Sequence, residues 1–224
     1  MAEIILVATL KGGESKSTTA CGLAASLATM QKSVLLIDAD EQETSYEFAQ
    51  IRKEEDVALF DCQKCVGTEV RDVILKLKQR YKYIIIDVGG RHTQSLRAAL
   101  SVANLLLIPV SPSSESLWSL TRQLNNSQPK FMDIVSEMKG VNPQLKVCAF
   151  VSQADSRGKD NEEVMKALQL IPGIEILPTV VKRRIAFRNA MACGLSVSEL
   201  KGKLKDPKAI DELNKLVSNV KNKL

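Results

Sequence analysis

Long apolar runs are missing from this sequence. The longest, such as residues 84–86 and 105–110, fall far short of the roughly 20 apolar residues that a membrane-spanning helix needs. The first residues lead directly into a strand-like run at 4–8, without the basic, apolar and cleavage segments of a signal peptide. We therefore expect a cytoplasmic protein without a membrane span.

Cysteine and histidine are also scarce. Five cysteines at irregular positions cannot all pair, which suits a reducing compartment. Cys62 and Cys65 have the spacing of metal ligands, but one such pair supplies only two of the four ligands of a structural zinc, so ordinary cysteines are the favoured interpretation. The single histidine, His92, has no partner evident in the sequence and is more readily a surface residue than a catalytic one.

Apolar and charged residues are present in globular proportions, 45% and 25% of 224 residues, which predicts one domain spanning residues 1–224. Short aliphatic runs alternate with longer helix-compatible stretches, the order of a parallel sheet covered by helices. The predicted class is α/β, a doubly wound, mostly parallel sheet with helices on both faces. We expect strands at 4–9, 34–37, 57–60, 83–86, 105–110, 147–151 and 175–177, and helices at 16–30, 44–54, 67–79, 93–102, 115–138, 160–169, 184–193 and 207–222.

Positive charge is concentrated at the C-terminal end of the chain. Residues 182–224 carry 11 Lys and Arg against 4 Asp and Glu, a charge of +7, whereas the whole chain carries +5. The remaining residues are therefore slightly acidic. This asymmetry fits either a polyanionic partner at the C-terminal end or a solvated, lysine-rich terminal helix.

The segment after the first expected strand has the residues of a phosphate-binding loop. It runs Leu-Lys-Gly-Gly-Glu-Ser-Lys-Ser-Thr over residues 10–18 and leads into an expected helix. Small residues let backbone N–H groups converge on phosphates, and the helix N-terminus favours negative charge. Lys16 would reach the outer phosphates, and the Ser17 hydroxyl would be a magnesium ligand. The predicted ligand is ATP with Mg²⁺.

This loop resembles the deviant Walker A motif, KGGxGK[ST], of the ParA/MinD superfamily of ATPases. The resemblance implies that Lys11 reaches across a nucleotide-sandwich homodimer to the ATP of the partner. It also implies ATP contacts from the whole loop, namely Lys11, Gly12, Gly13, Glu14, Ser15, Lys16, Ser17 and Thr18. Two residues depart from the motif. Ser15 replaces a glycine, which can strain the loop, and the carboxylate of Glu14 would repel triphosphate unless it points away.

Two further strand ends carry carboxylates in the order of this superfamily. Residues 38–42, Asp-Ala-Asp-Glu-Gln, resemble its DxDPQ segment, which implies that Asp40 orients the attacking water or holds the water shell of the metal. Residues 83–87, Tyr-Ile-Ile-Ile-Asp, resemble Walker B, which delivers Asp87 to magnesium. The glycines before Arg91 follow as a switch-like segment. The implied catalytic residues are Lys11, Lys16 and Asp40, and the implied metal ligands are Ser17, Asp40 and Asp87.

The later segments extend the resemblance over residues 3–200. Residues 105–118 resemble the ParA segment that leads into a long, dimer-facing helix. Residues 176–197 resemble its C-terminal pattern, which implies that Pro178 and Thr179 contact adenine in a loop past the last strand. No helix-turn-helix extension precedes the first strand, so the chain resembles the short (Soj-like) ParA subclass. That subclass implies a separate small DNA-binding adaptor, a ParB-like protein.

The function implied by the resemblance is plasmid or chromosome partition. In this scheme ATP drives dimerisation and nonspecific DNA binding in the nucleoid, and slow hydrolysis, stimulated by partner and DNA, resets the switch. Basic side chains suited to DNA phosphates are Lys182, Arg183, Arg184 and Arg188, joined by Lys201, Lys203 and Lys205. The alternatives are a scaffold with weakened or lost hydrolysis, a factor for other cargo such as a DNA-transfer complex, and a MinD-like membrane-positioning ATPase.

The membrane alternative depends on the apolar stripe at the C-terminal end. Its residues recur at the spacing of an amphipathic helix, with lysines between them: Leu213, Leu216, Val217, Val220 and Leu224. The stripe contains no Trp or Phe to anchor it in an interface, and it would equally seal a helix onto the core. Core packing is the favoured prediction.

Overall fold

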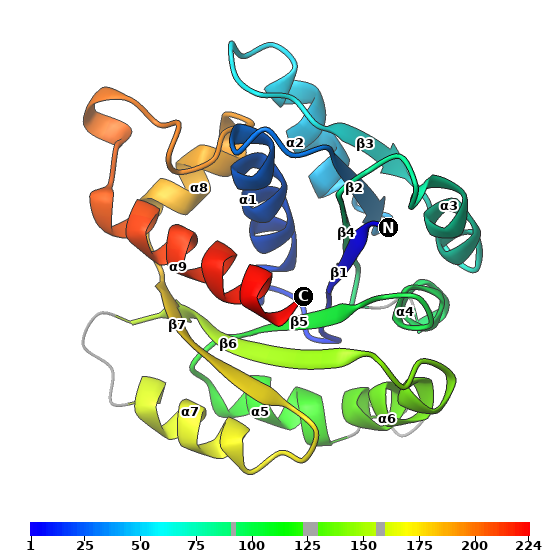
Figure 1. The fold of residues 1–224 in the computed structure, drawn as a ribbon. Helices are drawn as coiled ribbons and strands as arrows, with labels where there is room; N and C mark the ends of the chain where they lie inside the picture. Colours follow the sequence, from blue (N-terminus) through cyan, green and yellow to red (C-terminus); the bar gives the residue numbers. More distant parts are fainter. Residues whose placement is uncertain (91–92, 123–129, 156–159) are drawn as a thin grey trace.

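One seven-stranded parallel sheet organises the molecule (Figure 1). The computed structural model describes residues 1–90, 93–122, 130–155 and 160–224. The strand order is β3-β2-β4-β1-β5-β6-β7. The strands are β1 (Glu3–Val7), β2 (Val34–Ala39), β3 (Asp61–Lys64), β4 (Tyr83–Val88), β5 (Leu105–Val110), β6 (Lys146–Ala154) and β7 (Glu175–Lys182). The predicted doubly wound α/β fold is confirmed.

Helices cover both faces of this sheet (Figure 1). One face holds α1 (Lys16–Thr29), α2 (Thr44–Arg52), α8 (Ile185–Ala192) and α9 (Pro207–Lys223). The other holds α3 (Glu69–Leu77), α4 (Thr93–Leu100), α5 (Ser114–Thr121), α6 (Phe131–Val141) and α7 (Asp160–Gln169). Side chains of β1 alternate between the two, since Ile4 and Leu6 join one core and Ile5 and Val7 the other. Two-sided burial explains why the strands read as continuous apolar runs.

Helix α1 is packed on nearly every side. Its buried residues are spread around the helix rather than along one stripe, as expected of a helix in the core of a sheet-and-helix fold. At Gly22 an added Cβ would lie 3.4 Å from a methyl of Leu213, an ordinary van der Waals distance, so α9 packs directly against α1 at this position. The phosphate-binding loop at residues 10–18 (the P-loop) therefore leads into a helix that is held on most sides by the core.

Helix α9 uses the C-terminal apolar stripe for this packing. Asp206 caps its N-terminus by accepting hydrogen bonds from the N–H groups of Lys208 and Ala209, and Pro207 is the first helical residue. The stripe residues join the core on the α1 face: Leu213, Leu216, Val217 and Val220 are buried, and Leu224 packs at the edge. Among the described residues no helix is both long and apolar enough to cross a bilayer.

Strand β3 lies four residues later than predicted, at Asp61–Lys64 instead of 57–60. The prediction followed the apolar run, but β3 is an edge strand. Within the described part of the chain it pairs with β2 alone, from Leu35 opposite Asp61 to Asp38 opposite Lys64. An edge strand is open to solvent and tolerates charged residues. Pairing, rather than apolar content, decides its position.

Two further boundaries correct the predictions. The helix expected at 115–138 is two helices, because α5 ends at Thr121, Arg122 is in extended conformation, and α6 begins at Phe131. Pro129 in the sequence would break a continuous helix. Strand β7 continues from Glu175 to Lys182, past the expected end at 177. It is an edge strand whose register with β6 shifts around Pro178, so the missing N–H of this proline is tolerated.

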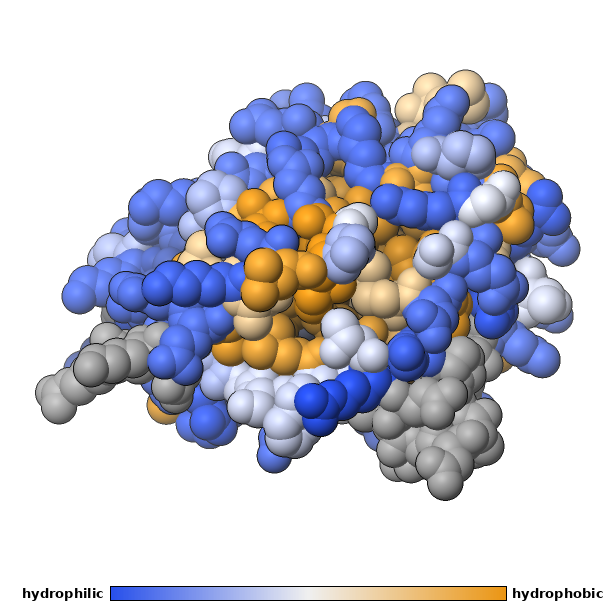
Figure 2. Space-filling view, turned by 90° about the horizontal axis from the view of Figure 1, so that it is seen from below, coloured by the Kyte–Doolittle hydropathy of each residue, from blue (hydrophilic) through white to orange (hydrophobic). Residues whose placement is uncertain are grey.

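The lower face of the molecule carries α5, α6 and α7. Figure 2 shows apolar surface gathered in its middle within a hydrophilic rim. Several partly buried residues of this region pack against the core cluster beneath them, among them Leu117, Met132, Met165 and Ile171. The outer side of that cluster thus reaches the surface between these helices.

Candidate nucleotide-binding site

The P-loop joins β1 to α1 and lines a cavity of about 570 Å³ at the carboxyl ends of the central strands. Gly13 and Ser15 both have left-handed backbone angles, with φ of 78° and 66°. Glycine adopts this conformation freely, whereas a serine side chain resists it. The suspected misfit at Ser15 is therefore present in the backbone. Ser15 is also the N-cap of α1, but its hydroxyl accepts no capping hydrogen bond. The first N–H groups of the helix are therefore not capped by this side chain.

Lys16 lies over this loop. Its Nζ donates to the carbonyl oxygen of Lys11 at 3.0 Å, and its side chain is largely buried. Burial lowers the pKa of the Lys16 ammonium, while the carboxylates of Asp87 and Asp40 oppose that shift. A partly desolvated cation beside free helix N–H groups suits an incoming polyphosphate.

Asp87 and Asp38 end neighbouring strands, and the register pairs them directly. Both carboxylates are buried. Asp38 accepts hydrogen bonds from the N–H groups of Asp40 and Tyr46 at 3.0 and 2.8 Å. Asp87 Oδ2 accepts from the Ser45 hydroxyl at 2.7 Å, whereas Asp87 Oδ1 is buried without a hydrogen-bond partner among the described residues. Burial raises the pKa of Asp87 to about 6, against the hydrogen bonds from Ser17 and Ser45 that lower it.

These oxygens fit Mg²⁺. The Asp87 carboxylate lies near the Ser17 hydroxyl and keeps one buried oxygen without a partner among the described residues, and hard oxygen donors of this kind are what the ion prefers. Within the described residues there is no cluster of three or more His, Cys, Asp or Glu placed to hold a metal unaided. Few protein ligands, completed by phosphate and water oxygens, is the usual arrangement for Mg²⁺.

Gly89 and Gly90 allow the chain after β4 to lie against the Asp40 carboxylate and against the P-loop. A Cβ at Gly89 would lie 2.6 Å from the Asp40 carboxyl carbon, and one at Gly90 would lie 2.4 Å from the Leu10 carbonyl oxygen. Only glycine allows these approaches. The switch-like segment is thus in direct contact with Asp40, although Arg91 and His92 lie outside the described residues.

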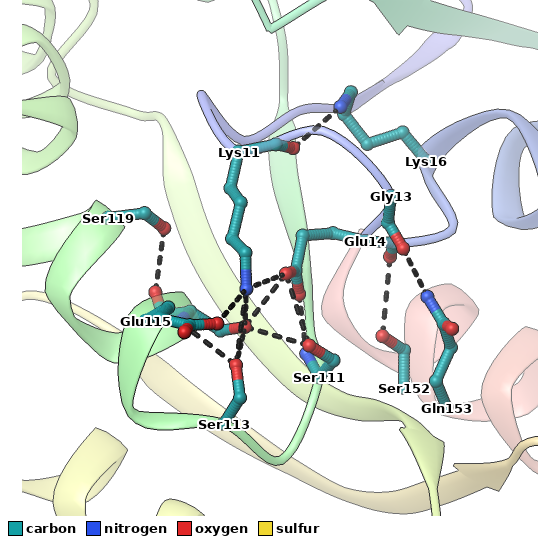
Figure 3. A network of polar contacts seen from close by, with 11 residues as sticks. Lys11, Gly13, Glu14, Lys16, Ser111, Ser113, Glu115, Ser119, Ser152 and Gln153 are labelled. Carbon is teal, nitrogen blue, oxygen red and sulfur yellow. Dashed lines mark hydrogen bonds and ion pairs between the residues drawn. The ribbon is translucent and has the colours of Figure 1, made fainter. Parts of the chain in front are cut away.

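Lys11 turns away from Lys16 and points towards the start of α5 (Figure 3). Its Nζ contacts the hydroxyls of Ser113 and Ser116 at 3.2 and 3.0 Å and pairs with Glu14 at 3.2 Å. The Glu14 side chain is buried and points into the same group, away from the loop interior. Repulsion between Glu14 and a triphosphate, which was the concern raised by the sequence, is therefore reduced by this orientation.

A second cavity, of about 640 Å³, adjoins the P-loop on its other side. Ser15, Thr18 and Thr19 form one wall, and the end of β7 with α8 forms another. The latter contributes all four side chains predicted to contact DNA: Lys182, Arg183, Arg184 and Arg188. Its apolar lining includes Phe150, Val181, Phe187 and Leu213. Apolar walls beside a phosphate loop suit a nucleotide base.

The four basic residues are not equally available. Arg183 and Arg188 are exposed. Arg184 is largely covered, because Glu212 pairs with it at 2.7 Å and Asp206 lies at 3.6 Å. Hydrogen bonding to Glu212 raises the pKa of the Arg184 guanidinium. Arg183 and Arg184 both line the cavity beside the P-loop, so replacing them would alter this cavity as well as the basic surface.

Pro178 and Thr179 do not reach either cavity. They lie inside β7, where Thr179 is buried and accepts a hydrogen bond from Asn219 at 2.6 Å. The loop past the strand, expected to follow residue 177, instead begins after Lys182. Residues of that loop occupy the position expected for a base contact.

Cys62 and Cys65 point to opposite faces of the sheet, because Cys65 belongs to one core cluster and Cys62 packs against the other. One metal ion cannot bridge them. All five cysteines are free thiols, and burial raises the pKa of Cys62 to about 12, so the Cys62 thiol stays protonated.

Several residues of the site had no signal in the sequence. Ser45 joins Asp87 from α2, and Gln153 donates from the end of β6 to the Gly13 carbonyl oxygen. Ser152 donates to the carbonyl oxygen of Glu14 at 3.3 Å. Each comes from a segment far from the P-loop in the chain. A positive φ of 51° at Gln153 marks its special backbone, but this cannot be read from sequence.

Comparisons with known proteins agree with this geometry. Residues 5–197 match the CobQ/CobB/MinD/ParA nucleotide binding domain. The maintenance of carboxysome distribution protein A of Halothiobacillus neapolitanus is 25% identical over 217 residues, covering 96% of this chain and 95% of that protein. The chromosome partitioning protein ParA of Myxococcus xanthus is 26% identical over 230 residues, covering 85% and 79%. An ATP complex of a Cyanothece McdA variant superposes with a TM-score of 0.75 at 19% identity, covering 98% and 96% of the two chains. The chain belongs to the ParA/MinD family of nucleotide-binding proteins.

Proposed function

We propose that this protein is an ATP-dependent positioning ATPase that partitions or distributes a cargo over DNA. The observation that carries the proposal is the meeting of three groups at one sheet edge. These are the P-loop with Lys16, the unpartnered Asp87 oxygen, and Asp40 against Gly89. ATP binding would favour a homodimer, and hydrolysis would return it to monomers.

Each residue has a distinct part in this proposal. Backbone N–H groups of Gly12 to Thr18 receive the phosphates, and Lys16 offsets their charge. Ser17 and Asp87 would hold Mg²⁺, with Asp40 near its water shell. When bound, the ion supplies charge neutralisation on the phosphates. Asp40 would orient the attacking water, because its carboxylate faces Gly89 at the rim of the cavity. Positioning and electrostatics carry such a reaction.

The base would lie in the neighbouring cavity. Its apolar wall, Phe150 and Val181, would contact the ring, and the exposed guanidiniums of Arg183 and Arg188 lie at its rim. This assignment replaces Pro178 and Thr179, which lie within the strand.

Nucleotide turnover is tested by phosphate release from wild-type protein, with and without duplex DNA. We expect slow release that DNA accelerates. Lys16→Ala should lose ATP affinity by about 100-fold or more, since a cation facing triphosphate is removed. Asp40→Ala should keep ATP binding and trap the dimer, as seen by light scattering. Equal phosphate release from wild type and Lys16→Ala would overturn the assignment.

DNA binding is the proposed use of the basic C-terminal region. The segment around the short 3₁₀ helix η1 (Gly202–Leu204) exposes Lys201, Lys203 and Lys205. Phosphate contacts of this kind read no sequence and weaken steeply with salt, with a log-log slope of about −0.9 per contact. A small DNA-binding adaptor and a cargo would then supply specificity. The relatives' names, which concern carboxysome distribution and chromosome partitioning, support a positioning role.

This use is tested by replacing Lys201, Lys203 and Lys205 with glutamate. We expect weaker ATP-dependent binding to arbitrary duplex, a shallower salt dependence and unchanged ATP affinity. The matched control replaces three exposed basic residues outside this region: Lys32, Lys76 and Arg80. Equal loss of DNA binding in both triple variants would contradict a specific surface.

A scaffold with weakened hydrolysis is the second candidate, favoured by the left-handed backbone of Ser15. It predicts ATP-dependent dimers without phosphate release in the same assay. The membrane alternative has lost its support, since the apolar stripe of α9 is buried. We expect no co-sedimentation with anionic liposomes.

A further inference from the structure

Glu14 lies at the centre of a cluster of polar side chains at the start of α5 (Figure 3). Its side chain is only 2% exposed. Oε2 accepts from the Ser111 N–H at 2.6 Å. Oε1 accepts from the Ser111 and Ser116 hydroxyls at 3.1 and 2.7 Å and faces Lys11 Nζ at 3.2 Å. Four donors thus converge on one buried carboxylate.

Lys11 is held in an unusual place for a cation. Its ammonium lies against the Ser113 and Ser116 hydroxyls in the first turn of α5. A helix N-terminus carries partial positive charge and disfavours a cation. Negative charge must therefore offset that repulsion. Glu14 supplies it from the interior, while Glu115 is 74% exposed, lies at 3.6 Å, and is screened by solvent.

We propose that Glu14 is a positioning residue that holds the Lys11 ammonium in an intrachain dock formed by Glu14, Ser113 and Ser116. The ATP of a second copy must then compete with Glu14 for the same ammonium. The inference rests on the proposed ATP-dependent dimer. The Lys11 ammonium has three N–H donors, and its contacts with Ser113, Ser116 and Glu14 can use all three. Binding to a partner's phosphates therefore requires at least one of these contacts to break, and the charged contact with Glu14 is the strongest of them. Glu14 thereby sets how tightly the ATP-bound copies associate, and it acts through Lys11 rather than on ATP.

Glu14→Gln is a suitable variant because it keeps the size of the side chain. The Ser111 N–H requires an acceptor, so the amide oxygen takes that position, and the amide NH₂ faces the two hydroxyls, which can rotate to accept. Lys11 then faces a donor and no charge. Ser113→Asp changes the dock in the opposite sense, since aspartate retains the N-cap of α5 and adds negative charge beside Lys11. Glu115→Gln is the matched control for an exposed charge.

The dock is tested first in nucleotide-free protein, by the acylation rate of the Lys11 amine measured by mass spectrometry. We expect faster labelling in Glu14→Gln, slower labelling in Ser113→Asp and little change in Glu115→Gln. This readout does not depend on ATP or on dimerisation. Unchanged labelling in both dock variants would overturn the proposal.

Competition is tested by the dimer dissociation constant with a non-hydrolysable ATP analogue, from analytical ultracentrifugation. We expect about tenfold tighter dimers in Glu14→Gln and about tenfold weaker dimers in Ser113→Asp, within the range of coupling between contacting groups. In a Lys11→Ala background Glu14→Gln should have no effect on any residual association, which separates positioning from a general change in loop structure.

The outcomes are distinct. If Glu14→Gln binds ADP normally but dimerises like wild type, the proposal is wrong. If Glu14→Gln fails to bind ADP, Ser113→Asp decides: an unchanged dimer constant contradicts the proposal. If wild type forms no dimer with the analogue, the proposed function fails together with the competition, whereas the labelling rates still report whether Glu14 holds Lys11.

Discussion

Two cation–glutamate pairs in this molecule differ in how they are enclosed. Arg52 is 1% exposed and makes a two-pronged contact with Glu199, with both nitrogen-to-oxygen distances at 2.8 Å. It also donates to the carbonyl oxygens of Ala58 and Gly194. Lys11 pairs with Glu14 at 3.2 Å, but its side chain is 27% exposed. We call Arg52–Glu199 the closed pair, because its cation is shielded from solvent, and Lys11–Glu14 the open pair, because its cation is partly exposed.

The difference follows from what each pair connects. Arg52 joins the end of α2 to residues 194–199. Gly194 lies so close to the end of α2 that an added Cβ would be 2.5 Å from the backbone nitrogen of Arg52. Releasing Arg52 would leave buried acceptors unpaired. Lys11 and Glu14 are three residues apart in one loop, and Glu14 keeps three other donors if the lysine leaves. A closed pair supports the fold, whereas an open pair can exchange partners.

The largest expected effect is on the closed pair. Arg52→Met should lower the free energy of unfolding by about 3–5 kcal/mol, because it leaves Glu199 partly buried without its cation. Denaturant titration measures this change. Lys53→Met is the control, since Lys53 is the exposed next residue. A loss below about 1 kcal/mol in Arg52→Met would erase the distinction between the two pairs.

The open pair should behave differently. Lys11→Ala should change the free energy of unfolding by about 1 kcal/mol or less, as for partly exposed pairs, and leave ADP affinity intact. It should nevertheless abolish the ATP-dependent dimer, measured by light scattering with a non-hydrolysable analogue. A dimer that persists in this variant would remove the cross-subunit part proposed for Lys11.

Lowering the pH should reduce the stability that the closed pair contributes. Burial raises the pKa of Glu199, but hydrogen bonds from Arg52 and the Ser196 N–H outweigh it, so the net pKa lies below the ordinary 4.5. A glutamate with a depressed folded pKa contributes stability that is present above its unfolded pKa and is lost as pH falls through the folded pKa. The loss is confined to the window between pH 4.5 and the lower folded pKa, and its slope stays below about 1.36 kcal/mol per pH unit for one proton. Wild-type stability should therefore fall more steeply with acid than that of Arg52→Met, and parallel curves would argue against this pair.

The structure brings together the residues predicted for the phosphate end of the site, because they follow strands in fixed local order. Asp87 lies near the end of β4, Lys16 begins α1 after the loop that follows β1, and parallel strands end at one edge. Their placement therefore needs only the strand order of the fold. The partner of Lys11 was less accessible, since Ser113 and Ser116 lie about a hundred residues further along the chain.

At the proposed base end the structure departs from the expected strand boundary, because pairing decides where an edge strand ends. Pro178 suggested a strand end, yet a shift of register on the open side of β7 accommodates it. The basic residues 182–184 were assigned to DNA from charge alone, whereas their position beside the P-loop depends on how far β7 extends. Composition gives the charge of a segment but not the surface that it faces.

The smallest expected effect concerns the P-loop backbone. Ser15 has φ 66° and ψ 28°, a left-handed conformation that costs an L-residue about 1–2 kcal/mol. Ser15→Gly removes this cost but increases the freedom of the unfolded chain, by about 0.5–1 kcal/mol. The net gain should lie between about 0 and 1.5 kcal/mol, or roughly 3–6 °C in Tm at most. Gln31→Gly is a matched control, because Gln31 has φ 56° at the exposed end of α1, away from the residues that line the phosphate cavity. Both variants should gain stability in thermal melts, but only Ser15→Gly should raise phosphate release, since only that position offers its backbone to phosphate. If Ser15→Gly gains stability like Gln31→Gly and yet turns over ATP more slowly than wild type, the serine hydroxyl contributes to the site, and the loop has adapted to the departure from glycine.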